Sequence, residues 1–222
     1  MSVLQLDGVT VSFRRNIIFD GVSHAFPHGC NMLLGDNGTG KSTLLGAIAG
    51  SVRYKGRIVV NGHEVTGDPV SARCMLAYVP DSAAFYPFVT GSQFTDFFLR
   101  AHGRLSAVDR GRYAELVSKL NVGDYLDTPF GEASLGTRKK FFLLGILLLA
   151  PEVLILDEPF NGLDVVTSRS LVDLVNEIGE SRTILLTCHH PAIVNEIHGV
   201  RWRLGKAPHM SIQRDARDHA PA

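Results

Sequence analysis

The sequence predicts an α/β domain built on a parallel β-sheet, with an antiparallel edge sheet and an inserted helical subdomain. Apolar runs at 31–34 and 153–156, and a run of similar length at 183–187, are each followed by a loop and a helical pattern. Runs of this kind are typical of parallel strands covered by helices on both faces. The chain has 222 residues, 45% of them hydrophobic, and is long enough to bury such a core.

The N-terminal part predicts the edge sheet. Apolar and polar residues alternate at 3–6, 9–13 and 57–60, which is the pattern of half-buried strands. The start of the chain has neither the basic residues nor the long apolar run of a signal peptide.

A helical subdomain is expected over 82–150, where strand patterns are nearly absent. Phe94, Phe97 and Phe98 recur at helical spacing within it. Its most apolar stretch, 141–150, is about half the ~20 residues that a membrane span needs, so we expect a buried helix there and no membrane crossing.

We expect a single domain over 1–222, with a frayed polar tail at 211–222. The charges balance, with 22 Lys+Arg against 22 Asp+Glu, so no global field favours nucleic acid as a partner. Cys30, Cys74 and Cys188 lie far apart, which argues against a zinc site or a disulfide framework and favours a reducing cytosol.

The motif with the clearest chemical meaning begins directly after the run 31–34. It reads GDNGTGKS over 35–42 and matches GxxxxGK[ST], the phosphate loop of a P-loop NTPase (RecA-like) core. Its glycines let backbone N–H groups surround a phosphate, and the following helix N-terminus favours negative charge. Lys41 is expected to reach the β- and γ-phosphates of ATP, and Ser42 to bind Mg²⁺. The residues expected to contact the nucleotide are Gly35, Asp36, Asn37, Gly38, Thr39, Gly40, Lys41, Ser42 and Thr43.

A second motif, VLILDEP at 153–159, places two acidic residues at the end of a buried strand. Asp157 is expected to hold the Mg²⁺ hydration shell beside the phosphate loop. Glu158 follows it, placed to orient or deprotonate the attacking water. Acidic residues at strand ends also cap helices, so this motif alone is weak.

These motifs together resemble the ABC ATPase family, and the resemblance covers essentially the whole chain. LILDEPFNGLD at 154–164 resembles the family's Walker B strand and D-loop, with Asp164 as the D-loop aspartate. SLGT at 134–137 occupies the position of the LSGGQ signature, and His189 that of the switch histidine.

The resemblance implies a mechanism shared by two subunits. In this family the subunits pair head to tail around two ATP molecules, each held by the phosphate loop of one subunit and the signature of the other. The implied activity is Mg²⁺-dependent ATP hydrolysis, with a homodimer expected before a heterodimer. The residues implied as catalytic are Glu158, His189 and Lys41, and those implied near the shared nucleotides are Ser134, Gly136 and Asp164.

The chain departs from the family pattern at several positions. Leu135 replaces the first signature glycine and Thr137 the glutamine; a positive φ at Leu135 would be strained. Asp81 stands where the Q-loop glutamine is usual, and is expected either to bind the metal or to face a partner. Phe13 replaces the tyrosine that stacks on adenine; it keeps the stacking face, and an ordinary core phenylalanine is the alternative. Glu158 is intact, which predicts a hydrolysing site.

Aromatic residues gather after Asp81, in FYPF at 85–88 and again at 94–98. One interpretation is the core of the helical subdomain. The other is a groove for a short helix of a transmembrane subunit, because in the family this segment forms that socket and aromatic side chains suit an anchor pocket.

Two classes of function remain open. In the first, the chain is the motor of a transporter, peripheral on the inner face of the cell membrane, with a separate transmembrane subunit. Asp81, FYPFVTGSQF and DEPFNGLD look most like stand-alone exporter subunits. In the second, the chain is a soluble ABC ATPase of the iron–sulfur cluster assembly type. The family's motor serves both uses, so fold and motifs do not choose between them.

Overall fold

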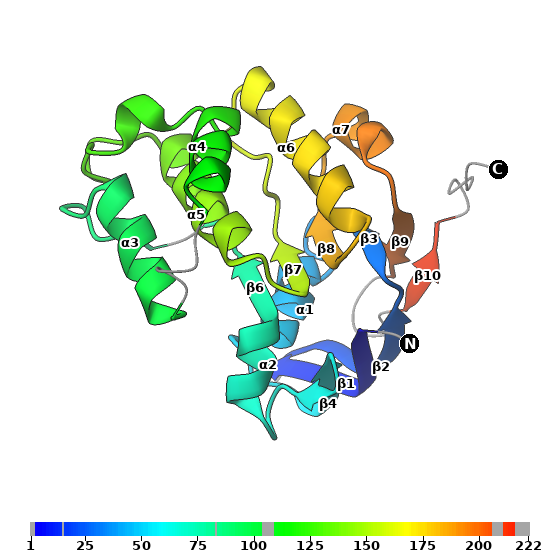
Figure 1. The fold of residues 1–222 in the computed structure, drawn as a ribbon. Coiled ribbons are helices and arrows are strands. Elements are labelled where there is room, and N and C mark those ends of the chain that lie inside the picture. Colours follow the sequence, from blue (N-terminus) through cyan, green and yellow to red (C-terminus); the bar gives the residue numbers. More distant parts are fainter. Residues whose placement is uncertain (1–2, 15, 83, 104–108, 206–210, 216–222) are drawn as a thin grey trace.

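The computed structural model describes residues 3–14, 16–82, 84–103, 109–205 and 211–215. Within these residues the central sheet has the order β10-β9-β3-β8-β7-β6 (Figure 1). Its strands are parallel except β10, which runs antiparallel to β9. They are β3 (Gly29–Leu34), β6 (Leu76–Val79), β7 (Val153–Leu156), β8 (Thr183–Thr187), β9 (Val200–Leu204) and β10 (Ile212–Arg214).

The predicted edge sheet is antiparallel, in the order β2-β1-β4-β5. The two alternating runs of the N-terminus belong to one strand, because the register of β1 shifts between Leu6 and Val9 around Gly8, whose φ is 56°. A shift of this kind moves the alternation out of phase without ending the strand. The strands are β1 (Leu4–Phe13), β2 (Asn16–Phe26), β4 (Lys55–Val60) and β5 (His63–Glu64).

Helices follow the strands along the chain. α3, α4 and α5 all lie between β6 and β7, in the segment where the sequence predicts a helical subdomain. The helices are α1 (Lys41–Ile48), α2 (Pro69–Met75), α3 (Gly91–Ala101), α4 (Arg110–Lys119), α5 (Leu135–Leu149), α6 (Val165–Gly179) and α7 (Pro191–Glu196). None of the helices in the described part of the chain is both long and apolar enough to span a membrane.

The central sheet is buried on both faces, which explains why β7 is apolar without alternation. Leu154 and Leu156 belong to the core formed with α4, α5 and α6. Val153 and Ile155 belong to the opposite core, formed with α1 and the antiparallel sheet. Figure 1 shows α6 on one side of this sheet and α1 with the antiparallel strands on the other. The ends of these buried strands carry the candidate site.

The predicted polar tail is wrong at residues 212–214. Ile212 pairs with Leu204 and Arg214 with Trp202, so this segment is the edge strand β10, and 216–222 lie outside the described residues. Asp215 adds an ion pair at 3.1 Å to Arg203. An edge strand needs only backbone pairing and one sheltered face, so its polar sequence gave no strand signal.

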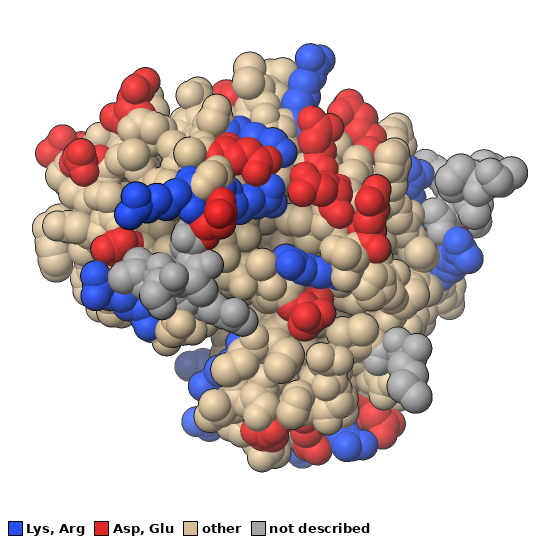
Figure 2. Space-filling model, viewed as in Figure 1, with Lys and Arg blue, Asp and Glu red and all other residues tan. Residues whose placement is uncertain are grey.

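The surface carries both signs of charge. The face in Figure 2 shows acidic and basic side chains interspersed. Several form ion pairs along the helices, such as Lys119 with Glu115 at 2.8 Å and Arg112 with Glu115 at 2.9 Å. Exposed pairs of this kind contribute only about 0–1 kcal/mol each to stability, so they do not determine the fold.

Candidate functional site

The phosphate loop connects β3 to α1 and is closed by its own lysine. Lys41 Nζ donates to the carbonyl oxygens of Gly35 at 2.7 Å and Asp36 at 2.9 Å. Gly40, with φ of 91°, caps α1 without any side-chain hydrogen bond. The first N–H groups of α1 therefore have no side-chain cap, as an anion site at a helix N-terminus requires. Burial lowers the pKa of Lys41, while Glu158, Asp157 and Asp36 act in the opposite direction.

The carboxyl ends of β7 and β8 meet beside this loop. Asp157 follows β7 and is 2% exposed. Thr187, the last residue of β8, donates its hydroxyl to Asp157 Oδ1 at 2.8 Å and accepts the N–H of Glu158 at 2.8 Å. One buried hydroxyl thus fixes both acidic positions. The sequence interpretation gave Thr187 no role, although a threonine ending an apolar strand is a visible signal.

Glu158 has a buried side chain and an unusual backbone. Its φ is 47°, in the left-handed region that non-glycine residues seldom occupy. The His189 Nε2 atom lies 2.9 Å from Glu158 Oε1, an ion-pair distance, yet neither carboxylate oxygen makes a hydrogen bond of good geometry to the protein. Burial raises the pKa of Glu158 and Asp157 raises it further, while His189 and Lys41 lower it. Both carboxylate oxygens of Glu158 are therefore buried without a hydrogen-bond donor from the described part of the chain.

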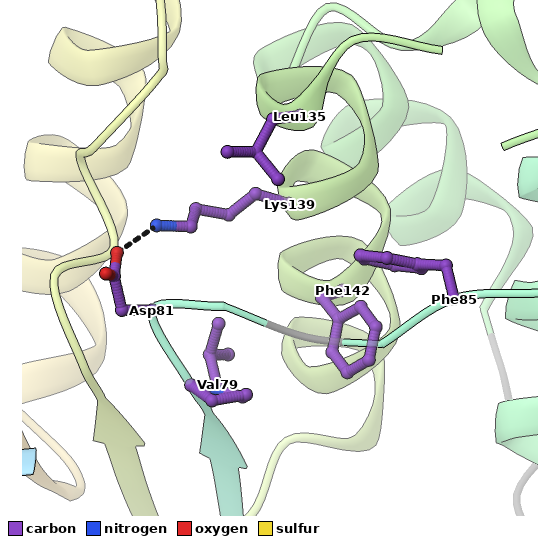
Figure 3. Close-up of a pocket in the computed structure, with 7 residues that line it drawn as sticks. Val79, Asp81, Phe85, Leu135, Lys139 and Phe142 are labelled. Carbon is purple, nitrogen blue, oxygen red and sulfur yellow. Dashed lines mark hydrogen bonds and ion pairs between the residues drawn. The ribbon is translucent and has the colours of Figure 1, made fainter. Parts of the chain in front are cut away.

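Asp81 follows β6 and is turned toward α5, as Figure 3 shows. Its Oδ1 accepts hydrogen bonds from Lys139 Nζ at 3.1 Å and Asn161 Nδ2 at 3.3 Å. The carboxylate is therefore engaged by the protein itself. Its binding of Mg²⁺ stays a prediction.

The signature position forms the start of α5. The helix begins at Leu135 and not near Thr137, because Ser134 is the N-cap and its hydroxyl accepts the N–H of Thr137 at 3.0 Å. Leu135 is thus helical and 55% exposed, and it does not have the positive φ that would strain it. Gly136 is required by packing, since a Cβ there would lie 2.1 Å from the carbonyl oxygen of Gly162.

Asp164 caps α6 and joins it to α5. Its carboxylate accepts the N–H of Thr167 at 2.8 Å, and Lys140 Nζ lies 2.6 Å from Oδ2. The hydrogen bond from Lys140, followed by the backbone N–H of Thr167, lowers the pKa of Asp164. Asp164 is consequently a charged, oriented group at the end of the D-loop.

Phe13 lies apart from this cluster in the fold, at the end of β1 in the antiparallel sheet. Its side chain is 52% exposed. Exposure of an aromatic face argues against the alternative of an ordinary core phenylalanine. The role in adenine stacking stays a prediction.

The residues present fit Mg²⁺ and ATP. Asp157 and the hydroxyl of Ser42 are oxygen donors of the kind that Mg²⁺ prefers. The uncapped start of α1 and the ammonium of Lys41 suit phosphate oxygens. The buried carboxylate of Glu158 without a protein donor suits a water molecule as its hydrogen-bond partner.

This arrangement is that of a nucleotide-hydrolysing P-loop domain, and comparisons with known proteins narrow the class. Residues 19–161 match the family described as ABC transporter. The manganese transport system ATP-binding protein MntA of Synechocystis is 31% identical over 86% of this chain and 77% of its own length. The linearmycin resistance ATP-binding protein LnrL of Bacillus subtilis is 27% identical over 85% of this chain and 61% of its own length. A solved structure described as the ATP-binding subunit of an ABC transporter has a TM-score of 0.85 at 23% identity, covering 98% of this chain and 91% of that one.

The chain belongs to the ABC transporter family, as an ATP-binding subunit. It is an ATPase coupled to transport that uses ATP with Mg²⁺, and subunits of this kind dimerise and pair with transmembrane subunits. The relatives do not favour the iron–sulfur assembly alternative, and they do not establish the expected outward direction of transport.

Proposed function

We propose that two copies of this chain close on two ATP molecules and reopen after hydrolysis, driving a separate transmembrane subunit. Each ATP lies between the phosphate loop of one copy and the start of α5 in the other. The exposure of Leu135, at the outer end of a buried helix, supports this proposal. Ser134 and Gly136 stand beside it and supply helix N-terminal N–H groups toward the partner's nucleotide.

The main observation behind the proposal is the group of acidic residues and a histidine at the carboxyl ends of β7 and β8. Asp157 and Glu158 follow β7, and His189 Nε2 lies 2.9 Å from Glu158 Oε1. Ser42 and Asp157 would hold Mg²⁺, which neutralises charge on the phosphates when bound. Glu158 acts as the base or orienting group for water, because burial raises its pKa toward the working pH. His189 orients Glu158 and senses the end of the nucleotide.

Glu158→Gln tests this assignment directly. The amide keeps the size of the side chain but cannot accept a proton, so hydrolysis should fall at least about a hundredfold. ATP binding should persist, and an ATP-dependent dimer of identical chains should accumulate in light scattering, with ADP leaving monomers. Hydrolysis at the native rate, or a monomer under saturating ATP, would contradict the proposal. A dimer that forms only with a second, paralogous chain would replace the homodimer with a heterodimer.

The transmembrane subunit docks, we propose, in an aromatic groove beside α3. This cavity of about 370 Å³ is bordered by Phe85, Tyr86, Phe94 and Phe97. Tyr86 and Phe97 are 72% and 70% exposed, whereas Phe85 packs edge-on against Phe130 at 4.9 Å. Exposed aromatic side chains over a packed aromatic floor form an anchor pocket for an apolar helix, which supports this partner.

Tyr86→Ala tests the groove better than a change at Phe85, which would also remove core contacts. The variant should retain its basal ATP hydrolysis but lose stimulation by the transmembrane subunit and transport in membrane vesicles. Tyr125→Ala is the matched control, since Tyr125 is 44% exposed and lies outside the groove. Coupling equal to that of the native chain would contradict docking at this surface.

For the direction of transport we propose export, with the chain on the inner face of the cell membrane. Asp81 in place of the usual glutamine, and the aromatic stretch that follows it, support export, as does the resistance role in the name of LnrL. The manganese transport relative points to metal cargo instead. Inverted vesicles containing both subunits decide between them: ATP-driven uptake of cargo into the lumen means export, and ATP-driven release means import.

A further inference from the structure

Lys139 is a buried lysine to which the proposed reaction assigns no role. It lies on α5, one turn after the signature position, with a side chain that is 5% exposed. Its ammonium donates to two groups at once, the backbone carbonyl of Glu158 at 2.8 Å and Asp81 Oδ1 at 3.1 Å. One side chain of the helix therefore contacts both loops that follow β6 and β7.

The surroundings of Lys139 favour a fixed position. Figure 3 shows its side chain extending from α5 toward Asp81, with Leu135, Phe142 and Val79 nearby. The free space between these residues is about 10 Å³, room for about one water molecule at most. Apolar walls of this kind strengthen the hydrogen bonds of a buried charge and make their loss expensive.

The carbonyl that Lys139 contacts belongs to the strained residue of the site. Glu158 has a φ of 47°, and backbone strain persists only where surrounding contacts hold it. The N–H of Glu158 is held by Thr187 at 2.8 Å. Its carbonyl is held by Lys139 and, at 3.2 Å, by the N–H of Asn161 in the same turn. Lys139 is thus the contact to this carbonyl that comes from outside the loop.

We propose that Lys139 is a positioning residue for ATP hydrolysis, which holds the peptide of Glu158 in its left-handed conformation and ties it to Asp81. The proposal rests on the proposed role of Glu158. Without the ammonium, the Glu158 peptide relaxes toward negative φ and its carboxylate leaves the position beside His189. Hydrolysis then slows, whereas ATP binding at the phosphate loop does not change.

The test compares three replacements in the full chain by steady-state hydrolysis, with the KM for ATP and the melting temperature measured in parallel. Lys139→Met removes both hydrogen bonds while keeping a side chain of similar length, and kcat should fall on the order of tenfold to a hundredfold with an unchanged KM. Lys139→Arg keeps charge and several donors and should stay within about threefold of the native chain. Lys139→Gln keeps an amide donor too short to bridge both partners and should be intermediate. Lys119→Met, on α4, is the control expected to hydrolyse ATP at the native rate.

A native kcat in Lys139→Met, a change confined to KM, or an arginine variant as slow as the methionine variant would each overturn the proposal. If Lys139→Met does not fold, equal kcat values for the glutamine variant and the native chain overturn it, and a lower kcat for glutamine than for arginine supports it. Glu158→Gln distinguishes a failure of the proposed role of Glu158 from a failure of the proposed role of Lys139. Undiminished hydrolysis in that variant rejects the proposed role of Glu158, whereas an inactive Glu158→Gln beside an active Lys139→Met rejects only the role of Lys139.

Discussion

The strand-end cluster and the signature end of α5 both take part in the proposed reaction, but they are built in opposite ways. At the strand ends Asp157, Glu158 and Thr187 are buried and joined by hydrogen bonds of 2.8 Å. At the signature end Ser134 and Leu135 are exposed. Contacts within one chain therefore hold the side chains of the strand-end cluster in place. The signature end faces solvent, and in the proposed dimer it would contact the nucleotide of the partner.

The largest effect should follow from removing the ammonium of the phosphate loop. Lys41→Ala deletes the ammonium that is expected to reach the γ-phosphate, so hydrolysis should drop by at least about a hundredfold. Binding of a fluorescent ATP analogue should weaken as well, in contrast to Glu158→Gln. Native hydrolysis in Lys41→Ala would mean that the positive charge needed for catalysis lies elsewhere. The proposed role of the phosphate loop and the neighbouring strand-end cluster would then be wrong.

A matched pair of threonines on β8 sharpens the account of the strand-end cluster. Thr187→Val leaves the N–H of Glu158 and Asp157 Oδ1 without the hydroxyl, and should lower stability by about 1–3 kcal/mol together with kcat. Thr183→Val removes a buried hydroxyl that has no hydrogen-bond partner, and should be neutral or stabilising. Urea unfolding and hydrolysis rates measure both. Equal effects of the two changes would mean that the Thr187 hydroxyl does not organise the site.

The signature end should respond to backbone crowding. Gly136→Ala places a Cβ 2.1 Å from the carbonyl oxygen of Gly162, and should cost about 1–3 kcal/mol of stability while shifting the D-loop against α5. Gly123→Ala is the control, because its Cβ would meet Val117 at an ordinary 3.7 Å. Thermal unfolding and ATP-dependent dimerisation distinguish them. An unaffected Gly136→Ala chain would show that the two segments separate freely.

The smallest effect concerns pH. Burial raises the pKa of Glu158 in the folded chain, so the charged form is disfavoured there. The resulting stability is present below the unfolded pKa of about 4.3 and is lost as pH rises through the folded pKa. Glu158→Gln should therefore raise the melting temperature relative to the native chain more at pH 8 than at pH 5, by about 2 °C or less. Glu132→Gln, an exposed change, should show no such trend, and a constant difference for Glu158→Gln would contradict a raised pKa.

Prediction from the sequence worked where a local pattern carries the chemistry. The runs 153–156 and 183–187 coincide with β7 and β8, which are buried on both faces and therefore lack the alternation of a half-exposed strand. The sequence was less informative for the strands toward the two ends of the central sheet. β6 is only four residues long, and β9 reads VRWRL with charged residues between apolar ones. Residues 212–214 of the predicted tail form β10, because a short polar segment gives no strand pattern even where it pairs with the preceding strand β9.

The phosphate loop, the acidic strand end and the order of motifs are enough to identify this chain, from its residues, as an ABC ATP-binding subunit that uses ATP with Mg²⁺. These motifs can be recognised in the sequence because each is a short contiguous segment. Its backbone N–H groups and its position at a strand end are set by local chain geometry. Only the tertiary structure decided that Thr187 bridges Asp157 to Glu158, that Gly136 packs on Gly162, and that Lys139 contacts Glu158 and Asp81. These contacts join residues 19 to 58 positions apart, and folding alone sets such distances.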